Sequence, residues 1–323
     1  MSRSNRFPKR AMRLAAAALA VLFAALVSFG CIPENVKTQF EDVTHEVGER
    51  FDSICFDVDV SKIEIKLDEG GACRAECHET EKLRHTVEVK DGVLKIESHN
   101  TGKWYERFFN TGFIGDSPKV TLYLNEAEFV SLEVWSDTGS VIVPDGLTFH
   151  TFSIKCDTGS VDIGAVKTHD AKIELDTGGA SLNGVETKTL SVKADTGYIG
   201  LSSIKAETVS AETDTGRIKA EDVECDLFDA ESDTGAISLI NVTVSGKMTV
   251  KEDTGAIKFE NCEAGEIEAS AQTGSITGTL RSEMVFDAKS DLGKVEVPSS
   301  TTGGRCWLRT DTGRIKIEYA PGH

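Results

Sequence analysis

Apolar and polar residues alternate in short runs along most of the chain, and between residues 131 and 319 the runs recur at a regular interval. Each interval holds two runs, such as Leu190 and Val192 followed by Ile199 and Leu201, in which apolar residues are two positions apart. A spacing of two places side chains on one face of an extended strand. The pattern therefore predicts pairs of strands that each bury one face.

An Asp-Thr-Gly triplet, or a close variant of it, separates the two runs of each interval. Successive triplets begin 19 or 20 residues apart, which indicates a repeat architecture. Glycine, present in all ten copies, fits a turn with positive φ, and the aspartate fits an Asx-turn. One variant repeat keeps the inward apolar pattern at Phe286, Ala288, Val295 and Val297. The triplets start at Asp137, Asp157, Asp176, Asp195, Asp214, Asp233, Asp253 and Asp311, and the variants at Gln272 and Asp291.

A strand–turn–strand unit of this length cannot bury its inner face alone, whereas stacked units bury a continuous core, one coil every ~4.8 Å. The predicted fold class is all-β: a single-stranded parallel β-solenoid (β-helix) with 19- or 20-residue coils, regular over the ten repeats of residues 131–319. Right-handed winding is favoured, because parallel crossover connections are right-handed. A left-handed solenoid stays open, because hexapeptide repeats also have coils of ~18 residues.

Residues 51–130 lack the triplet but keep the alternation. The segment "VEVKDGVLKIES" (Val87–Ser98) contains the Asp-Gly turn typical of a β-hairpin. Because the end of a solenoid exposes an open strand edge, we expect residues 51–130 to form either irregular first coils or a β cap. Residues 31–50 are expected to be a tether.

The first 30 residues are an expected signal or anchor segment. They contain five basic residues and no acidic one, with the apolar run "LAAAALAVLFAALVSF" (Leu14–Phe29). Cys31 follows "LVSFG", which resembles a bacterial lipobox, so Cys31 is the expected lipidation site. An uncleaved anchor is the alternative, because the run is only just short of the ~20 residues that span a bilayer. Both place the remaining chain at the cell envelope, outside the cytoplasmic membrane.

Residues 31–323 are strongly acidic, with 30 Lys and Arg against 53 Asp and Glu, a net charge of −23. Such a surface repels nucleic acids and anionic lipid headgroups and attracts cations and basic partners. We therefore expect no nucleic-acid partner.

The triplet also occurs in aspartic proteases, which need two facing carboxylates that share a proton. Ten equivalent corners single out no such pair, and the constant interval leaves no loop to wall a polysaccharide-binding groove. We expect no enzyme activity, no catalytic residue and no cofactor, and a polysaccharide-active β-helix enzyme is the weaker alternative. Structural Ca²⁺ bridging adjacent coils is the one cation expected at the corner. Its candidate ligands are Asp137, Asp157, Asp176, Asp195, Asp214, Asp233 and Asp253.

The cysteines raise two further expectations. Cys73, Cys77 and His78 in "CRAECH" form a second candidate metal site, and Cys55, Cys73 and Cys77 are expected to include one disulfide, which export permits. Four later cysteines are expected to be unpaired, three of them as small buried side chains. The inward three are Cys156, Cys262 and Cys306, and the fourth is Cys225.

The segment "KVTLYLNEAEFVSLEVWSDTGSV" (Lys119–Val141) and later units such as "LSVKADTGYIGL" (Leu190–Leu201) resemble a bacterial family of "putative adhesin" domains of unknown function. The resemblance covers residues 51–319. It implies β-strand repeats, often on membrane-anchored or lipoprotein precursors, and supplies no catalytic residues.

One irregular segment, "KWYERFFNTGFIGDSP" (Lys103–Pro118), concentrates aromatic side chains. We expect it to pack over the core as a cap or to contact a partner. The candidate partner-binding residues are Trp104, Tyr105, Phe108, Phe109 and Phe113.

The sequence thus favours a non-enzymatic β-solenoid of the cell envelope that presents an acidic surface to a protein or glycan. An N-terminal lipid or anchor would attach it to the membrane. The alternative function is a sensor or regulatory module of an envelope stress system that contacts a membrane partner.

Overall fold

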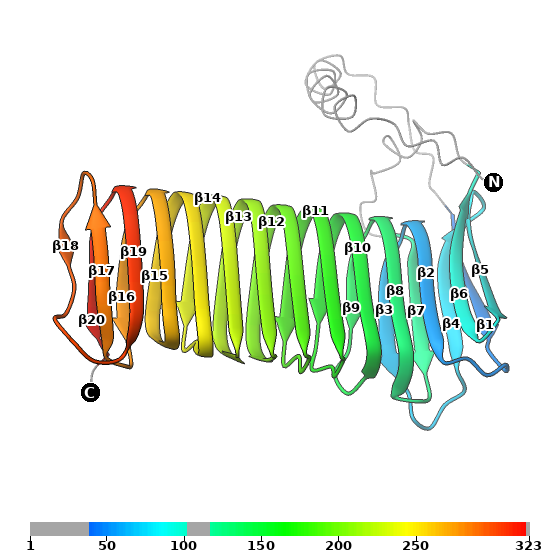
Figure 1. Cartoon of the computed structure of the whole chain (residues 1–323). Helices are drawn as coiled ribbons and strands as arrows, with labels where there is room; N and C mark the ends of the chain where they lie inside the picture. Colours follow the sequence, from blue (N-terminus) through cyan, green and yellow to red (C-terminus); the bar gives the residue numbers. More distant parts are fainter. Residues whose placement is uncertain (1–38, 102–116, 321–323) are drawn as a thin grey trace, which may run out of the picture. The chain divides into compact units, whose positions relative to one another are not determined.

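The computed structural model describes residues 39–101 and 117–320. The predicted fold class is confirmed: the described residues form strands and no helix, and the strands build a parallel β-solenoid of about nine turns. By its internal contacts the chain divides into Met1–Gln39 and Phe40–His323, and the solenoid belongs to the second unit. Figure 1 shows its coils side by side. None of the described residues forms a helix with the length and apolar character needed to cross a membrane.

The strands follow one another with short connections. They are β1 (Phe40–Glu46), β2 (Ser53–Val60), β3 (Lys62–Leu67), β4 (Arg74–Thr80), β5 (Leu83–Lys90), β6 (Val93–Asn100), β7 (Lys119–Leu124), β8 (Glu128–Thr138), β9 (Val141–Val143), β10 (Thr148–Ile163), β11 (Asp170–Asn183), β12 (Thr189–Lys205), β13 (Thr208–Cys225), β14 (Leu227–Ile240), β15 (Thr243–Thr273), β16 (Ile276–Leu280), β17 (Met284–Ser290), β18 (Val295–Glu296), β19 (Gly304–Thr312) and β20 (Ile315–Tyr319).

The central coils stack in parallel with their triplets in register. Thr158 pairs with Thr177 and Gly159 with Gly178, and the same pairing continues from coil to coil. The strand does not stop at the triplet, because β10 runs through it and leaves only Asp157 outside the ladder. The triplet is therefore a bend within a continuous strand, where the sequence had suggested a turn between two strands.

The core fills the inside of the coils, as the alternation predicted. The four inward positions of the repeat are buried throughout the central coils, with Phe152, Phe228 and Phe259 among the largest. Residues after the second bend, such as Val166 and Val185, close a third side of the core. Burial of these apolar columns is the main stabilising term of the fold.

Backbone contact between coils explains the glycine of the triplet. A Cβ placed on Gly216 would lie 1.6 Å from the carbonyl oxygen of Gly197, and one on Gly235 would lie 1.5 Å from that of Gly216. Neither glycine has φ in the left-handed region. The expectation of positive φ is therefore wrong at these two coils, where glycine is required because the preceding coil leaves no room for a side chain. It holds at five other triplet glycines, whose φ lies between 140° and 159°: Gly139, Gly159, Gly178, Gly197 and Gly274.

The second bend does use the left-handed region. Asp222, Asn241 and Asn261 occupy the same place in successive coils, with φ of 55°, 52° and 56°. Asn and Asp tolerate this conformation better than other residues with a side chain. Asn241 Nδ2 donates to Asp222 Oδ1 at 2.9 Å, and Asn261 Nδ2 donates to Asn241 Oδ1 at 2.8 Å. The three side chains thus form a hydrogen-bonded ladder along this bend.

At the N-terminal end, the coil order departs from the chain order. The coil of β2 and β3 lies between β8 and β9 on one side and β6 and β7 on the other, all in parallel pairing. Strand β4 then pairs antiparallel with β7, and β1 pairs antiparallel with β4. The predicted hairpin is confirmed as β5 and β6, with Asp91 and Gly92 at positive φ.

The described residues between 51 and 130 therefore contribute both a coil and antiparallel strands that cover the edge. The tether expected for residues 31–50 is wrong for Phe40–Glu46, because these residues form β1.

At the C-terminal end, the order of the coils in the stack also differs from their order in the chain. Strand β19 pairs with β15 on one side and β17 on the other, and β20 pairs with both β16 and β18. The last coil in sequence is thus enclosed, and β17 and β18 form the outermost coil, as Figure 1 shows. Here the inward prediction fails in part, because no described strand covers the outer side of this coil: Val295 is exposed, and Phe286, Ala288 and Val297 are only partly buried.

Candidate functional site

The seven aspartates predicted to bind Ca²⁺ lie at the same bend of successive coils, and their side chains are exposed or half-exposed. Among the described residues, the one group of three metal-ligating side chains whose ligand atoms lie within 4.8 Å of one another is elsewhere. At the C-terminal end of the column, Gln272 Nε2 donates to Asp253 Oδ1 at 2.6 Å. An amide thus replaces a like-charged neighbour there, while Ca²⁺ binding by the other aspartates stays a prediction.

Four of these aspartates, Asp176, Asp195, Asp214 and Asp233, form no ion pair with any Lys or Arg in the described part of the chain. Lys193 acts electrostatically on two of them, but its ammonium forms its hydrogen bond with Glu212, which raises the pKa of Lys193. The bend therefore carries a line of four carboxylates that no Lys or Arg of the described residues neutralises by contact.

Other outward charges are paired between or within coils. Lys167 contacts Glu186 at 3.0 Å, and Lys251 contacts Glu231 at 3.7 Å. Exposed pairs of this kind contribute little stability each, about 0–1 kcal/mol. Their effect is to neutralise part of the acidic charge on the surfaces between the bends.

A short buried polar column lies beside the triplets, and the sequence had not indicated it. Thr213, Ser232 and Glu252 pair in register on successive coils, each at most 2 % exposed. Gly235 N donates to Glu252 Oε1 at 3.1 Å, whereas Glu252 Oε2 has no hydrogen-bond partner within residues 39–101 and 117–320. Burial raises the pKa of Glu252 to about 7, against hydrogen bonds that act to lower it.

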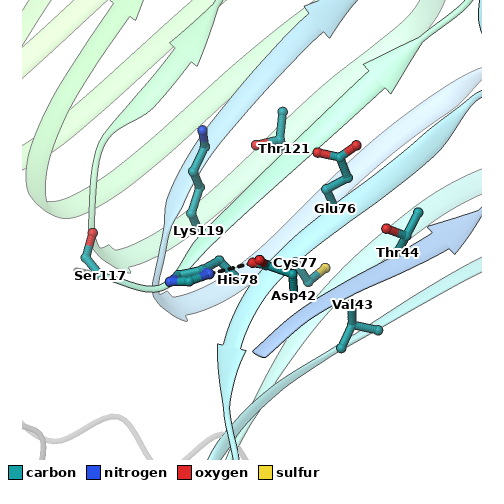
Figure 2. A pocket seen from close by; sticks show the side chains of 9 residues that line it. All are labelled: Asp42, Val43, Thr44, Glu76, Cys77, His78, Ser117, Lys119 and Thr121. Carbon is teal, nitrogen blue, oxygen red and sulfur yellow. Dashed lines mark hydrogen bonds and ion pairs between the residues drawn. The ribbon is translucent and has the colours of Figure 1, made fainter. Parts of the chain in front are cut away.

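A hollow of about 460 Å³ opens on the outer face of β1, β4 and β7 (Figure 2). His78 Nδ1 lies 2.6 Å from Asp42 Oδ1, and the ring of Phe40 stacks on His78 with 4.5 Å between centroids. Lys119 Nζ contacts Glu64 Oε2 at 2.5 Å, and this contact lowers the pKa of Glu64. Because its charged groups are paired with one another, the hollow offers polar contacts rather than a reactive group.

A second, shallower hollow lies on a face of the central coils. It is lined by Tyr198 and Arg217, which pair in register, and by Gly216, Gly235 and Ala236. The Tyr198 ring lies over Gly200, where a Cβ would meet it at 2.6 Å. An exposed ring beside a guanidinium, with small neighbours, is a contact surface that the repeat pattern did not predict.

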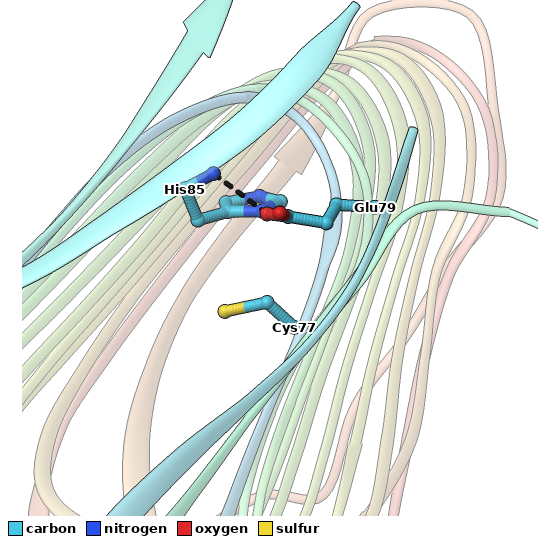
Figure 3. Close-up of side chains that lie close together, drawn as sticks. All are labelled: Cys77, Glu79 and His85. Atoms are coloured by element: carbon cyan, nitrogen blue, oxygen red, sulfur yellow. Dashed lines mark hydrogen bonds and ion pairs between the residues drawn. The ribbon is translucent and has the colours of Figure 1, made fainter. Parts of the chain in front are cut away.

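The candidate metal site at Cys73, Cys77 and His78 is not formed as predicted. Alternation along β4 turns Cys77 and Glu79 inward and His78 outward, toward Asp42. The structure instead brings Cys77 and Glu79 together with His85 of β5, all three buried (Figure 3). Period-two alternation within "CRAECHET" was the available signal for this separation.

His85 also connects Ser61 and Glu79 in the order of a hydrolase triad. Ser61 Oγ lies 3.0 Å from His85 Nε2, and His85 Nδ1 lies 3.1 Å from Glu79 Oε2. Ser61 is only 2 % exposed, so a substrate has no access to its hydroxyl. Burial lowers the pKa of His85. The geometry is thus that of a buried hydrogen-bonded network and gives no support for acyl transfer.

The disulfide expected among Cys55, Cys73 and Cys77 is wrong, because all three are unpaired. Cys55 lies on β2 and faces the opposite way from its buried neighbours Ile54 and Phe56, whereas the other two face inward around β4. The prediction for Cys156, Cys225, Cys262 and Cys306 is confirmed, since these four are buried and unpaired.

Two predicted features lie outside the described residues. They are the lipidation site Cys31 and the aromatic residues Trp104, Tyr105, Phe108, Phe109 and Phe113. Both stay predictions.

The fold and its repeat define a capped parallel β-solenoid. The chain belongs to the Toastrack DUF4097 family, which matches residues 51–316. No curated protein matches it.

Several solved structures are similar. One is a "putative adhesin" from Bacteroides fragilis, 15% identical, with a TM-score of 0.39 and coverage of 87% of this chain and 97% of that one. A "putative adhesin" from Parabacteroides distasonis is 12% identical, with a TM-score of 0.31 and coverage of 87% and 98%. A "Putative lipid binding protein" from the same species is 15% identical, with a TM-score of 0.35 and coverage of 86% and 97%.

Proposed function

We propose that this protein is a non-enzymatic β-solenoid of the cell envelope that presents an acidic surface to a protein or glycan. The observation that supports the proposal is the line of carboxylates at Asp176, Asp195, Asp214 and Asp233, which form no ion pair within the described residues. The solenoid holds one carboxylate per coil, so the charge has a fixed spacing. A basic partner or a cation-bridged glycan fits such a surface.

A pull-down from envelope extracts with the full chain tests this proposal. The test variant changes Asp176, Asp195, Asp214 and Asp233 to Asn. The control variant changes four ion-paired acids, Glu186, Glu212, Glu231 and Glu260, to Gln, so it loses the same charge away from the line. We expect capture at low ionic strength to fall for the test variant only. Equal capture by both variants and the parent would contradict the proposal, and protease treatment of the extract separates protein from glycan partners.

Attachment at the envelope is part of the same proposal. Residues 1–30 would direct export, and lipid on Cys31 would hold the chain at the membrane. Radiolabelled palmitate should then enter the parent chain but not Cys31→Ala. Label that persists in the variant, or membrane attachment without label, would favour the uncleaved anchor.

Two narrower proposals accompany it. We infer that Trp104, Tyr105, Phe108, Phe109 and Phe113 add a contact surface. A variant with Trp104, Phe108 and Phe109 changed to Ser should therefore lose partners in the same pull-down.

Structural Ca²⁺ at the aspartate line would raise the melting temperature of the protein at millimolar Ca²⁺, and an unchanged melting temperature would count against it.

A further inference from the structure

The inner face of the N-terminal antiparallel strands holds a group of side chains with the ligand atoms of a metal centre. Cys77 and Glu79 lie two residues apart on β4, and His85 lies on the following strand, β5. Their thiol, carboxylate and imidazole ligand atoms are all within 4.8 Å of one another, and the residues are 1 %, 3 % and 4 % exposed. Figure 3 shows the Glu79 carboxylate against the His85 ring, with the Cys77 side chain beside them.

Hydrogen bonds to residues outside the group already orient two of these side chains. Ser61 Oγ lies 3.0 Å from His85 Nε2, and Arg84 Nη1 donates to Glu79 Oε1 at 2.8 Å. The other atom of each side chain faces the group: His85 Nδ1 lies 3.1 Å from Glu79 Oε2. In a tetrahedral zinc site with bonds near 2.0 Å, two such ligands are separated by about 3.3 Å. Outer hydrogen bonds of this kind orient ligands in metal sites.

A hydrogen-bonded network alone accounts for Glu79 and His85 but leaves other groups unexplained. Cys77 has no hydrogen-bond partner among the described residues, although its Sγ lies within 4.8 Å of the ligand atoms of Glu79 and His85. His45, on the neighbouring strand β1, has a buried Nε2 with no hydrogen-bond partner in the described part of the chain, and it acts electrostatically on His85. Cys77 also borders the hollow of Figure 2.

We propose that Cys77, Glu79 and His85 bind a divalent cation of the zinc class and thereby link β4 to β5 over the end of the solenoid. The mixed sulfur, nitrogen and oxygen set favours zinc over the hard cations Ca²⁺ and Mg²⁺. Cys77 binds as a thiolate and releases its proton to solvent, and His85 binds through Nδ1 while Nε2–H donates to Ser61. The site is separate from the aspartate line and does not depend on the proposed function.

Cobalt substitution in the purified full chain tests the site. We expect one Co²⁺ per chain, with a thiolate-to-cobalt charge-transfer band, displaced by Zn²⁺. Cys77→Ser should abolish the band and weaken Co²⁺ binding at least tenfold, and Ser61→Ala should weaken it by a smaller factor. The matched control is Cys73→Ser, because Cys73 is also inward and only 5 % exposed but lies outside the group.

Absence of Co²⁺ binding, or a band that survives Cys77→Ser, would overturn the proposal. If Cys77→Ser fails to fold, hydrogen exchange of the parent chain decides instead. Zn²⁺ should slow exchange in β4 and β5 and leave β12 and β13 unchanged. Equal exchange in β4 and β5 with and without Zn²⁺ would also overturn it.

Discussion

At the first bend, each glycine backbone packs against a carbonyl of a neighbouring coil. This contact limits the residue at ten similar positions, and it arises between coils rather than within one. The sequence correctly predicted that glycine was required there. It could not give the reason, because a close approach to another coil and a turn with positive φ select the same residue.

Gly216→Ala should destabilise the protein, because its Cβ would lie 1.6 Å from the carbonyl oxygen of Gly197. Relief of the clash requires the two coils to separate, at a cost of about 1–3 kcal/mol. Gly179→Ala is the matched control, since its nearest contact would be an ordinary 3.4 Å. Urea denaturation should show a lower midpoint for Gly216→Ala only. A similar loss in both variants would mean that chain flexibility, rather than the clash, dominates.

Glu252 should make stability depend on pH. Its pKa is raised from 4.5 to about 7 by burial, so between these values the folded state holds a proton that the unfolded state has lost. The free energy of unfolding therefore falls as pH rises through this window and is constant above it. Glu252→Gln should be more stable than the parent at pH 8, by roughly 2 kcal/mol, and equal to it near pH 4. Denaturation at several pH values measures both free energies of unfolding. An increase in the stability of the parent relative to the variant as pH rises would contradict the prediction.

At the scale of strands, alternation was sufficient to place most inward side chains. It identified the hairpin β5–β6 and the buried columns of the central coils. It did not identify β1, whose sequence "FEDVTHE" is largely polar and gains its strand by pairing with β4. The metal-ligating group was missed for a related reason. Cys77 and Glu79 are close to His85 only because β4 and β5 both lie on the covered end of the solenoid.

The side-chain ladder at the second bend gives a prediction at this scale. Asn241 has φ of 52° and bonds to Asp222 below it and Asn261 above it. Asn241→Ala should lose both bonds and add the cost of a left-handed alanine, together about 2–3 kcal/mol. Asn241→Gly loses the bonds but relaxes the backbone, so it should cost about 1 kcal/mol. Equal losses in thermal denaturation would show that backbone strain contributes nothing here.

At the scale of the molecule, the coils at both ends of the solenoid stack in an order that differs from their order along the chain. The repeat pattern cannot reveal this, because a coil presents the same apolar columns to whichever coil stacks on it. The burial of the outermost coil does reveal it, since Val295 is exposed whereas the equivalent residues of inner coils, such as Ile257 and Ile276, are fully buried. Enclosing β19 and β20 places the C-terminal strands in the interior of the stack rather than at its edge.

Truncation should separate this arrangement from a sequential solenoid. Among the described strands, β17 pairs only with β19, and β18 pairs only with β20. A chain that ends at residue 299 loses β19 and β20, so β17 and β18 have no strand beside them and should exchange amide hydrogens at unfolded rates. Deletion of residues 283–302 removes the outermost coil instead and should leave β19 protected against β15. In a sequential solenoid the results would reverse, because the shorter chain would keep β17 protected and the internal deletion would disturb the stack.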